Sequence, residues 1–153
     1  MTQAIQTFLR LRPSCKQVLV TAQARLSAHA NRCFDNSMAV CLANSHRYTL
    51  RSGWLAGENM KHLGTVFIPH YWVFNEKTSR HLDPTPRAPG DSQAYDYLQD
   101  MDILLQATAE QPLPVPVRLN ALGDLEVLVR SDTWQALQVL STDILFKLAQ
   151  YLG

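Results

Sequence analysis

The sequence lacks several features that would assign it to a class at once. No run of apolar residues approaches the length that crosses a membrane, and the N-terminus has no hydrophobic segment typical of a secretion signal. No cluster of Lys and Arg is interleaved with aromatic residues, and the formal net charge is only +1. We therefore expect a cytoplasmic protein, or one delivered from the cytoplasm as an effector, that binds neither nucleic acid nor a membrane.

Cysteines are few, and their spacing argues against two further classes. The three, Cys15, Cys33 and Cys41, are an odd number without a CxxC pair, which argues against a disulfide framework and indicates a reducing compartment. A metal site built from Cys33 with His62, His70 or His81 would lack four ligands at a recognisable spacing. We expect no metal and no cofactor, and one of the cysteines is a candidate for chemistry.

Acidic residues are missing from the start of the chain. None precedes Asp35, whereas five basic residues do: Arg10, Arg12, Lys16, Arg25 and Arg32. Such a start occurs in some transit signals, but we favour the solvated face of a surface helix as its origin. The 153 residues, 46% of them hydrophobic, suffice for one domain with a core, so we expect a single domain over 1–153.

Helical patterns fill the first third of the chain. A first helix is predicted before Pro13 and a second over 14–29, with these residues turned inward: Ile5, Phe8, Leu9, Val18, Leu19, Ala22 and Leu26. Residues 31–45 have almost no polar stripe beyond their first turn, which predicts a helix that is buried on most sides. Asn31 is its expected N-cap, Asp35 suits the helix dipole, and Cys41 is expected in the core.

Strand patterns follow. Residues 48–56 and 65–74 are rich in aromatic and β-branched residues, which predicts two strands. Residues 87–110 predict a loop and then a helix with these residues on one face: Leu98, Met101, Leu104 and Leu105. Alternating prolines make 112–117 an extended loop or edge strand, whereas "LEVLV" predicts an inner strand and the residues from 131 a final helix. The order predicts an α+β fold, with N-terminal helices and a buried Cys-bearing helix packed on a small antiparallel sheet.

The stretch "PHYWVFNEKTSRHLDPTP", residues 69–86, predicts a β-hairpin with chemical groups at matching ends. If the chain turns at Glu76 and Lys77, Trp72 faces His81 and His70 faces Asp83. Directly opposed side chains share a face about 4.5–5.5 Å apart, so the imidazole and the carboxylate can bond. The register is an assumption, because Glu-Lys is a poor two-residue turn and a slip of one residue would oppose His70 to Pro84.

Cys33, in the first turn of the buried helix, is the candidate proton donor for that imidazole. Helix N-termini and imidazolium ions lower the pKa of a thiol from about 8.5 to roughly 3.5–7.5, which gives a nucleophilic thiolate. First-turn N–H groups can also stabilise an oxyanion on an attacked carbonyl. Asn36, one turn later, is a candidate for supporting the site or binding a substrate amide, with capping of the helix as the alternative.

Residues 31–86 resemble the catalytic core of the transglutaminase-like and papain-like superfamily, which includes bacterial arylamine N-acetyltransferases. The likeness rests on Cys33 at the start of a helix, "SGW" at 52–54, His70 before an aromatic pair, and "LDPTP" at 82–86. The resemblance implies Cys33 as nucleophile, His70 as general base and acid, and Asp83 as the orienting group. It also implies Gly53 and Trp72 as structural markers, with Trp72 in a supporting role.

The resemblance further implies a papain- or transglutaminase-like fold and acyl transfer through a Cys thioester. Resolution by water would make the protein a peptidase, amidase or glutamine deamidase that acts on a protein, peptide or small amide. Resolution by an amine would make it a transglutaminase or N-acetyltransferase. We rank hydrolysis first because the chain shows no second substrate domain. The alternative is an interaction protein that keeps the fold and docks a partner through "PLPVPV" or the final helix.

Overall fold

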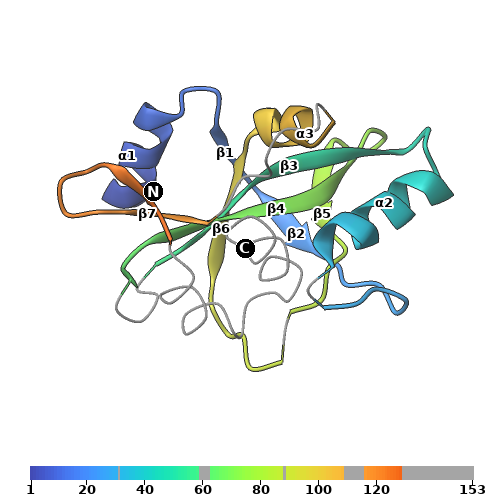
Figure 1. Cartoon of the computed structure of the whole chain (residues 1–153). Helices are drawn as coiled ribbons and strands as arrows, with labels where there is room; N and C mark the ends of the chain where they lie inside the picture. Colours follow the sequence, from blue (N-terminus) through green and yellow to red (C-terminus); the bar gives the residue numbers. More distant parts are fainter. Residues whose placement is uncertain (31, 59–62, 88, 109–115, 129–153) are drawn as a thin grey trace.

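The computed structural model describes residues 1–30, 32–58, 63–87, 89–108 and 116–128. Over these residues the fold is α+β, with helices packed on a mostly antiparallel sheet of eight strands (Figure 1). In chain order the elements are α1 (Gln3–Leu11), β1 (Lys16–Val18), β2 (Val20–Ala22), α2 (Cys33–Ala43), β3 (Tyr48–Gly57), β4 (Val66–Asn75), β5 (Arg80–Asp83), β6 (Tyr95–Gln99), α3 (Met101–Thr108), β7 (Val117–Leu119) and β8 (Leu125–Val127).

The long strands β3 and β4 form the centre of the sheet. They pair antiparallel along their whole length, from Tyr48 opposite Asn75 to Gly57 opposite Val66. Six strands follow one another in the order β1-β6-β3-β4-β5-β2, and the β7–β8 hairpin joins the far end of β4. The two strands predicted from aromatic and β-branched residues are thus confirmed.

The segment predicted as a second helix, 14–29, was predicted wrongly. It forms β1, which pairs with β6, and β2, which pairs in parallel with β5 at the other end of the strand order. Val18 and Val20 pack against the core, whereas Leu19 between them is 92% exposed, and Leu26 is fully exposed. The apolar residues therefore follow the alternation of a strand, and they serve two partner strands that lie far away in the sequence.

Two hydrophobic cores lie on opposite faces of the sheet. One face, here called the Trp72 face, carries Leu55, Ile68, Trp72 and Tyr97. The other, the Trp54 face, is covered by the helices and carries residues from several elements: Ile5, Phe8, Cys33, Trp54, Phe67, Tyr71, Leu98 and Ile103. The rings of Phe8 and Phe67 stack with centroids 4.0 Å apart, which packs α1 on β4, and Phe8 is turned inward as the helical spacing predicted.

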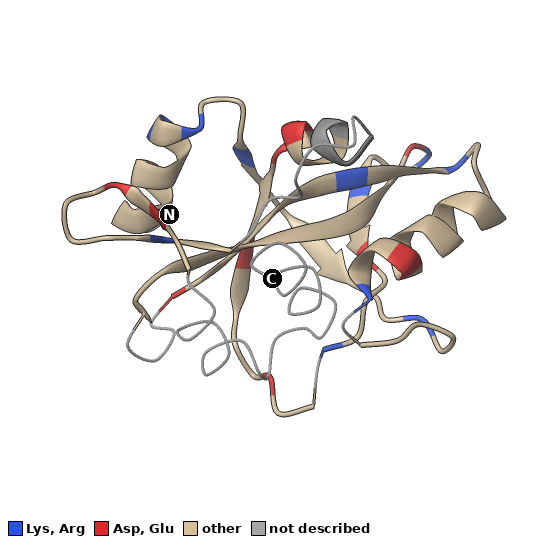
Figure 2. Ribbon diagram, viewed as in Figure 1, with Lys and Arg blue, Asp and Glu red and all other residues tan. Residues whose placement is uncertain are grey.

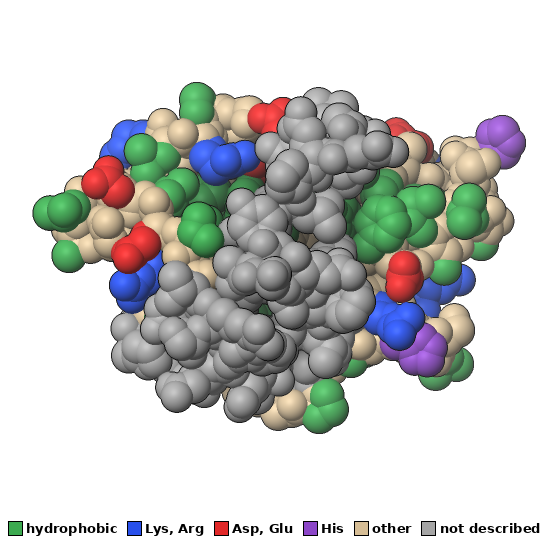
Figure 3. Space-filling view, in the orientation of Figure 1, with side chains coloured by type: hydrophobic (Ala, Val, Ile, Leu, Met, Phe, Trp, Pro, Cys, Tyr) green, Lys and Arg blue, Asp and Glu red, His purple; other side chains and the backbone are tan. Residues whose placement is uncertain are grey.

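Helix α2 buries one side only, which corrects the prediction that it is buried on most sides. Cys33, Asn36, Ser37 and Val40 face the sheet, whereas Leu42 is 77% exposed. Cys41 is half-buried rather than a core residue. Apolar side chains accordingly gather at the α2 end of the molecule in Figure 3. The described residues place no second layer over this side of the helix, and Asn31 lies outside them.

Two predictions for the second half of the chain were also wrong. Leu98 belongs to β6 and not to a helix, because Tyr97 and Leu98 face opposite cores as neighbours in a strand do. The segment "LEVLV" supplies β8, which among the described strands pairs with β7 alone and is an outer strand with Glu126 exposed. The final helix, most of the Pro-rich segment 112–117 and the side chain of Leu105 lie outside the described residues.

Charged residues are spread over the described elements, with basic and acidic side chains interspersed (Figure 2). Of the five basic residues before Asp35, Arg10 lies on α1, and the exposed Lys16, Arg25 and Arg32 lie on a strand and in loops. Arg12 differs from them, because its guanidinium bonds to the buried carboxylate of Asp100 at 2.7 Å. Across the residues that the structure describes, no helix is both long and apolar enough to span a membrane.

Gly53 is required by the packing between β3 and its neighbours. A Cβ atom at this position would lie 2.1 Å from the carbonyl oxygen of Leu98 and 2.6 Å from the Trp72 ring. We expect Gly53→Ala to lower the free energy of unfolding by about 3 kcal/mol or more, since backbone has to move to admit the methyl group. Urea denaturation measures this loss.

Gly64→Ala is the matched control for this substitution. Gly64 has a φ of +74° but no atom within 4 Å of an added Cβ, so only backbone strain of about 1–2 kcal/mol is expected. Equal losses of unfolding free energy in the two variants would contradict a requirement for glycine by close packing at Gly53.

Candidate active site

The pairing of β4 with β5 brings His70 and Asp83 to the same face in an unpredicted register. Val73 lies opposite Leu82 and Asn75 opposite Arg80, two residues away from the expected pairing. The chain turns through four residues, Glu76 to Ser79, and Ser79 has a φ of 55°. The predicted two-residue turn and the direct opposition of His70 to Asp83 were therefore wrong. A shift by an even number nevertheless keeps each side chain on its face, so the two groups still meet.

The predicted contact between imidazole and carboxylate is present. His70 Nε2 lies 2.7 Å from Asp83 Oδ2, and both side chains are buried. The hydroxyl of Tyr97 donates to the same Oδ2 at 2.6 Å, and the backbone N–H of Thr85 donates to Oδ1 at 3.0 Å. Three donors thus fix the orientation of the carboxylate.

The electrostatics of this cluster favour an imidazolium. Burial by itself lowers the pKa of His70, but the Asp83 carboxylate and Cys33 together raise it to about 10. Burial would raise the pKa of Asp83, but His70, Tyr97 and the Thr85 N–H together hold it below its usual value. His70 therefore stays protonated and Asp83 ionised at neutral pH.

Cys33 reaches His70 from the helix layer on the Trp54 face. One edge of β4 pairs with β3. The other edge pairs with β7 at Val66 and Phe67 and with β5 from Val73 onward, so His70 lies between these two partner strands. There the Cys33 thiol bonds to the His70 side chain. Because Nε2 is committed to Asp83, Nδ1 is the ring nitrogen left for the thiol. The structure thus brings the three residues of the predicted triad together.

The two predicted supporting residues fasten the surroundings of the triad. Asn36 Nδ2 donates to the His29 carbonyl at 2.7 Å and to Thr85 Oγ1 at 3.1 Å, and its Oδ1 accepts the His29 N–H. It therefore ties the loop before α2 to the turn after Asp83. Trp72 is fully buried, covers Gly53 and donates from Nε1 to His81 Nδ1 at 3.0 Å. Both residues hold the elements that carry the site.

Tyr97 is the site residue that sequence reasoning did not assign. Its ring is buried against Trp72, with centroids 5.4 Å apart. The available signal was the alternation of Tyr95 and Tyr97 in β6, which places both on one face of a strand. A helix was predicted in this segment, so the alternation was not recognised.

The other cysteines and histidines stand apart from the triad. Burial, together with Asp100, raises the pKa of Cys15 to about 12, and burial also raises the pKa of Cys41. His29 and His46 are exposed, and His62 lies outside the described residues. Within the described ranges no group of three or more His, Cys, Asp or Glu side chains is arranged to hold a metal ion.

Comparisons with known proteins give this chain no assignment. No family model matches it, and no curated protein or solved structure matches it either. The site is therefore interpreted from its own geometry.

Proposed function

We propose that this protein is a cysteine-dependent acyl-transfer enzyme, and that it hydrolyses an amide or ester through a thioester on Cys33. The observation that carries the proposal is the buried chain from Cys33 through His70 to Asp83, in which one imidazole bonds both a thiol and a carboxylate. A thiol beside an imidazolium at the start of a helix has the surroundings that produce a nucleophilic thiolate.

The first half of the reaction forms the thioester. The Cys33 thiolate attacks the substrate carbonyl carbon, a sulfur–carbon bond forms, and the π electrons move to the oxygen. The helix α2 begins at Cys33, and the positive end of a helix dipole stabilises a negative charge that develops beside it, here on that oxygen. When the tetrahedral species collapses, the bond to the leaving group breaks and His70 Nδ1 gives its proton to the departing amine or alcohol.

The second half returns the enzyme to its starting state. Neutral His70 takes a proton from water, and the water oxygen attacks the thioester carbon. The sulfur–carbon bond then breaks, the acid product leaves, and the thiolate–imidazolium pair forms again. An amine in place of water would give acyl transfer, as in a transglutaminase or N-acetyltransferase, through the same thioester.

The arrangement of the elements supports a papain- or transglutaminase-like core as part of this proposal. Cys33 opens a helix that packs on β4 and β3, His70 lies on β4, and Asp83 ends β5. This order along the chain is the order of the families that residues 31–86 resemble. Gly53 beneath the Trp72 ring explains why the "SGW" strand and the His-x-Trp strand occur together.

Competitive alkylation tests whether Cys33 is the activated thiol. At pH 6, limiting iodoacetamide is expected to label Cys33 before Cys15 and Cys41, because only thiolates react and the pKa values of the other two are raised. Peptide mass spectrometry gives the order of labelling.

Exposure and the proposed pairing of Cys33 with His70 predict opposite orders of labelling, which makes this test decisive. Cys33 is 3% exposed and Cys15 8%, whereas Cys41 is half-buried, so accessibility alone would favour Cys41. The preference for Cys33 should also disappear in His70→Gln, which keeps a polar side chain but cannot carry the counter-charge. Labelling of Cys41 first in the unmodified protein would contradict the proposal.

A further inference from the structure

We infer that Tyr97 is a positioning residue of this site, whose hydroxyl holds the buried Asp83 carboxylate in place and charged while His70 is neutral. The hydrogen bond from Tyr97 to Asp83 follows from the geometry of the structure, whereas its role in catalysis rests on the proposed function.

Tyr97 lies on β6 and Asp83 lies on β5. In the strand order these two strands are separated by β3 and β4. The extended segment 16–22 brings the two strands together, because Val18 pairs with Tyr97 and Ala22 pairs with Asp83. The Tyr97 ring is held edge-on against Trp72, and its centroid lies 5.9 Å from that of His70. The direction of the hydroxyl is thus set by packing on the Trp72 face.

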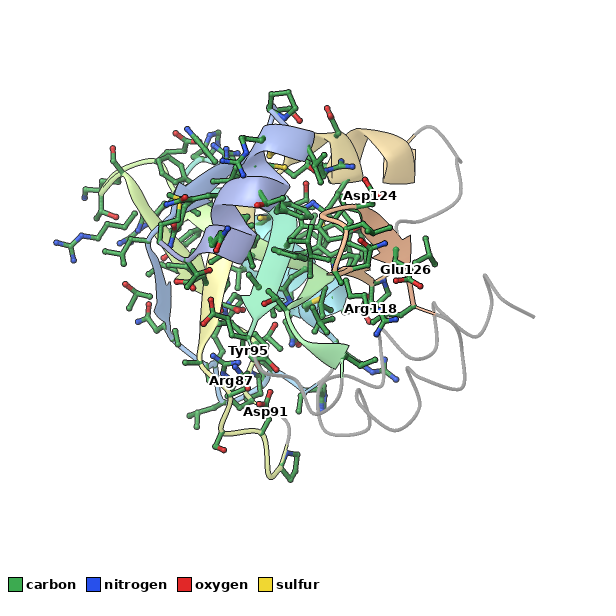
Figure 4. All side chains as sticks on the ribbon, turned by 90° about the vertical axis from the view of Figure 1, so that its left-hand side faces the viewer. Arg87, Asp91, Tyr95, Arg118, Asp124 and Glu126 are labelled. Atoms are coloured by element: carbon green, nitrogen blue, oxygen red, sulfur yellow. The ribbon has the colours of Figure 1, made fainter. Side chains whose placement is uncertain are left out.

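The charged and titratable groups around Asp83 come from three elements and a loop. His70 lies on β4, Cys33 on α2 and Tyr97 on β6, while Arg87 acts on Tyr97 from the loop after β5. Figure 4 shows Arg87 beside Asp91 and Tyr95; its guanidinium lies 3.8 Å from Asp91 and 4.6 Å from the Tyr95 ring. Arg87 therefore affects the site by charge at a distance, and the direct donor to Asp83 Oδ2 beside His70 is Tyr97.

The Tyr97 hydrogen bond matters most when His70 has given up its proton. With His70 protonated, Asp83 is one half of an ion pair. With His70 neutral, the ion pair is lost and hydrogen bonds alone hold the buried charge: the Nε2–H that His70 keeps, the Tyr97 hydroxyl and the Thr85 N–H. Burial and Asp83 raise the pKa of Tyr97 above its usual value, so it remains a donor in both states. The Tyr97 hydroxyl thus stabilises the state with neutral His70 more than the state with protonated His70. It therefore lowers the proton affinity of His70.

This effect falls on the step in which His70 is a base. After thioester formation His70 has lost its proton, and water can attack only while it stays neutral. Without the Tyr97 hydroxyl the imidazole would be protonated more readily, and less of the thioester would be in its reactive form at neutral pH. The inferred role is therefore in resolving the acyl-enzyme.

The test measures the His70 pKa by NMR of the imidazole in full-length Cys33→Ala protein. Removing the thiol takes away its contribution to that pKa, which brings the titration toward neutral pH. Adding Tyr97→Phe keeps the ring and removes only the donor, so the His70 pKa should rise by about one unit. Tyr95→Phe is the matched control, since Tyr95 lies on the same strand and bonds Asp91 instead. It should leave the His70 pKa unchanged.

A second variant covers the case in which Tyr97→Phe does not fold. Replacing Tyr97 with 3,5-difluorotyrosine keeps the hydroxyl and strengthens it as a donor, so the His70 pKa should fall. The inference is overturned if the His70 pKa is unchanged by these replacements, or if Tyr95→Phe moves it equally. Because the background lacks Cys33, this failure is distinct from failure of the proposed function, which alkylation of the intact protein would reveal.

Discussion

Cys33→Ala is expected to reduce hydrolysis of an activated ester such as p-nitrophenyl acetate to the uncatalysed background. Without the sulfur no thioester forms, and loss of the nucleophile in a serine protease costs about 10⁶-fold in kcat. The fold should persist, because the removed atom leaves only a small cavity in the first turn of α2. Release of p-nitrophenolate measures the rate, and circular dichroism monitors folding.

Cys41→Ala is the control for this loss. Cys41 lies eight residues later on the same helix and is half-buried, so its replacement perturbs α2 without touching the triad. It should keep the activity of the unmodified protein. If Cys33→Ala stays folded and hydrolyses the ester as fast as Cys41→Ala does, Cys33 is not the nucleophile.

Asp83→Asn is expected to lower the same rate by up to about 10⁴-fold, less than the loss in Cys33→Ala. The carboxylate accepts from His70 and Tyr97 on one oxygen and from Thr85 on the other. A carboxamide turned with its NH₂ toward His70 forces the ring proton onto Nδ1, where it faces Cys33. Turned the other way, the NH₂ opposes the Thr85 N–H and leaves donors unpaired. Both orientations damage the base.

The rate of alkylation separates loss of charge from loss of shape in this variant. Asp83 helps to raise the pKa of His70 to about 10, so its neutralisation lowers that pKa and weakens the proposed counter-ion of Cys33. Alkylation of Cys33 at pH 6 should then be slower than in the unmodified protein. An unchanged rate in folded Asp83→Asn would show that the carboxylate does not maintain the proposed pair of His70 with Cys33.

The strands β3 and β4 and the hairpin of β4 with β5 could be predicted because the residues that indicate them are close together in the sequence. Aromatic and β-branched residues define β3 and β4, and the period of two places His70 and Asp83 on one face even though the turn was predicted wrongly. The true register depends on Asn75, whose side chain accepts the N–H groups of Lys77 and Thr78 and so stabilises a longer turn. Such a turn is not apparent from the dipeptide at its centre.

The parts that were missed depend on pairing between residues far apart in the sequence. Val18 and Val20 look equally suitable for a helix or a strand, and their partners, Tyr97 and His81, lie more than sixty residues away. In the structure, β1 and β2 bring β6 close to β5. Because this segment was predicted as a helix, the prediction gave no reason for β6 and β5 to be close. The contact of Tyr97 with Asp83, and hence its place in the site, could not be predicted for the same reason.

The most direct test of the central claim is to trap the acyl-enzyme. The protein is mixed with an activated ester, quenched in acid within the first turnover, and examined by peptide mass spectrometry. We predict an acyl group on Cys33 that neutral hydroxylamine removes, as expected of a thioester, and that decays to free acid unless an added amine captures it. Acylation only at lysines or at Cys41, or no acylation while the ester is consumed, would contradict a Cys33 thioester mechanism.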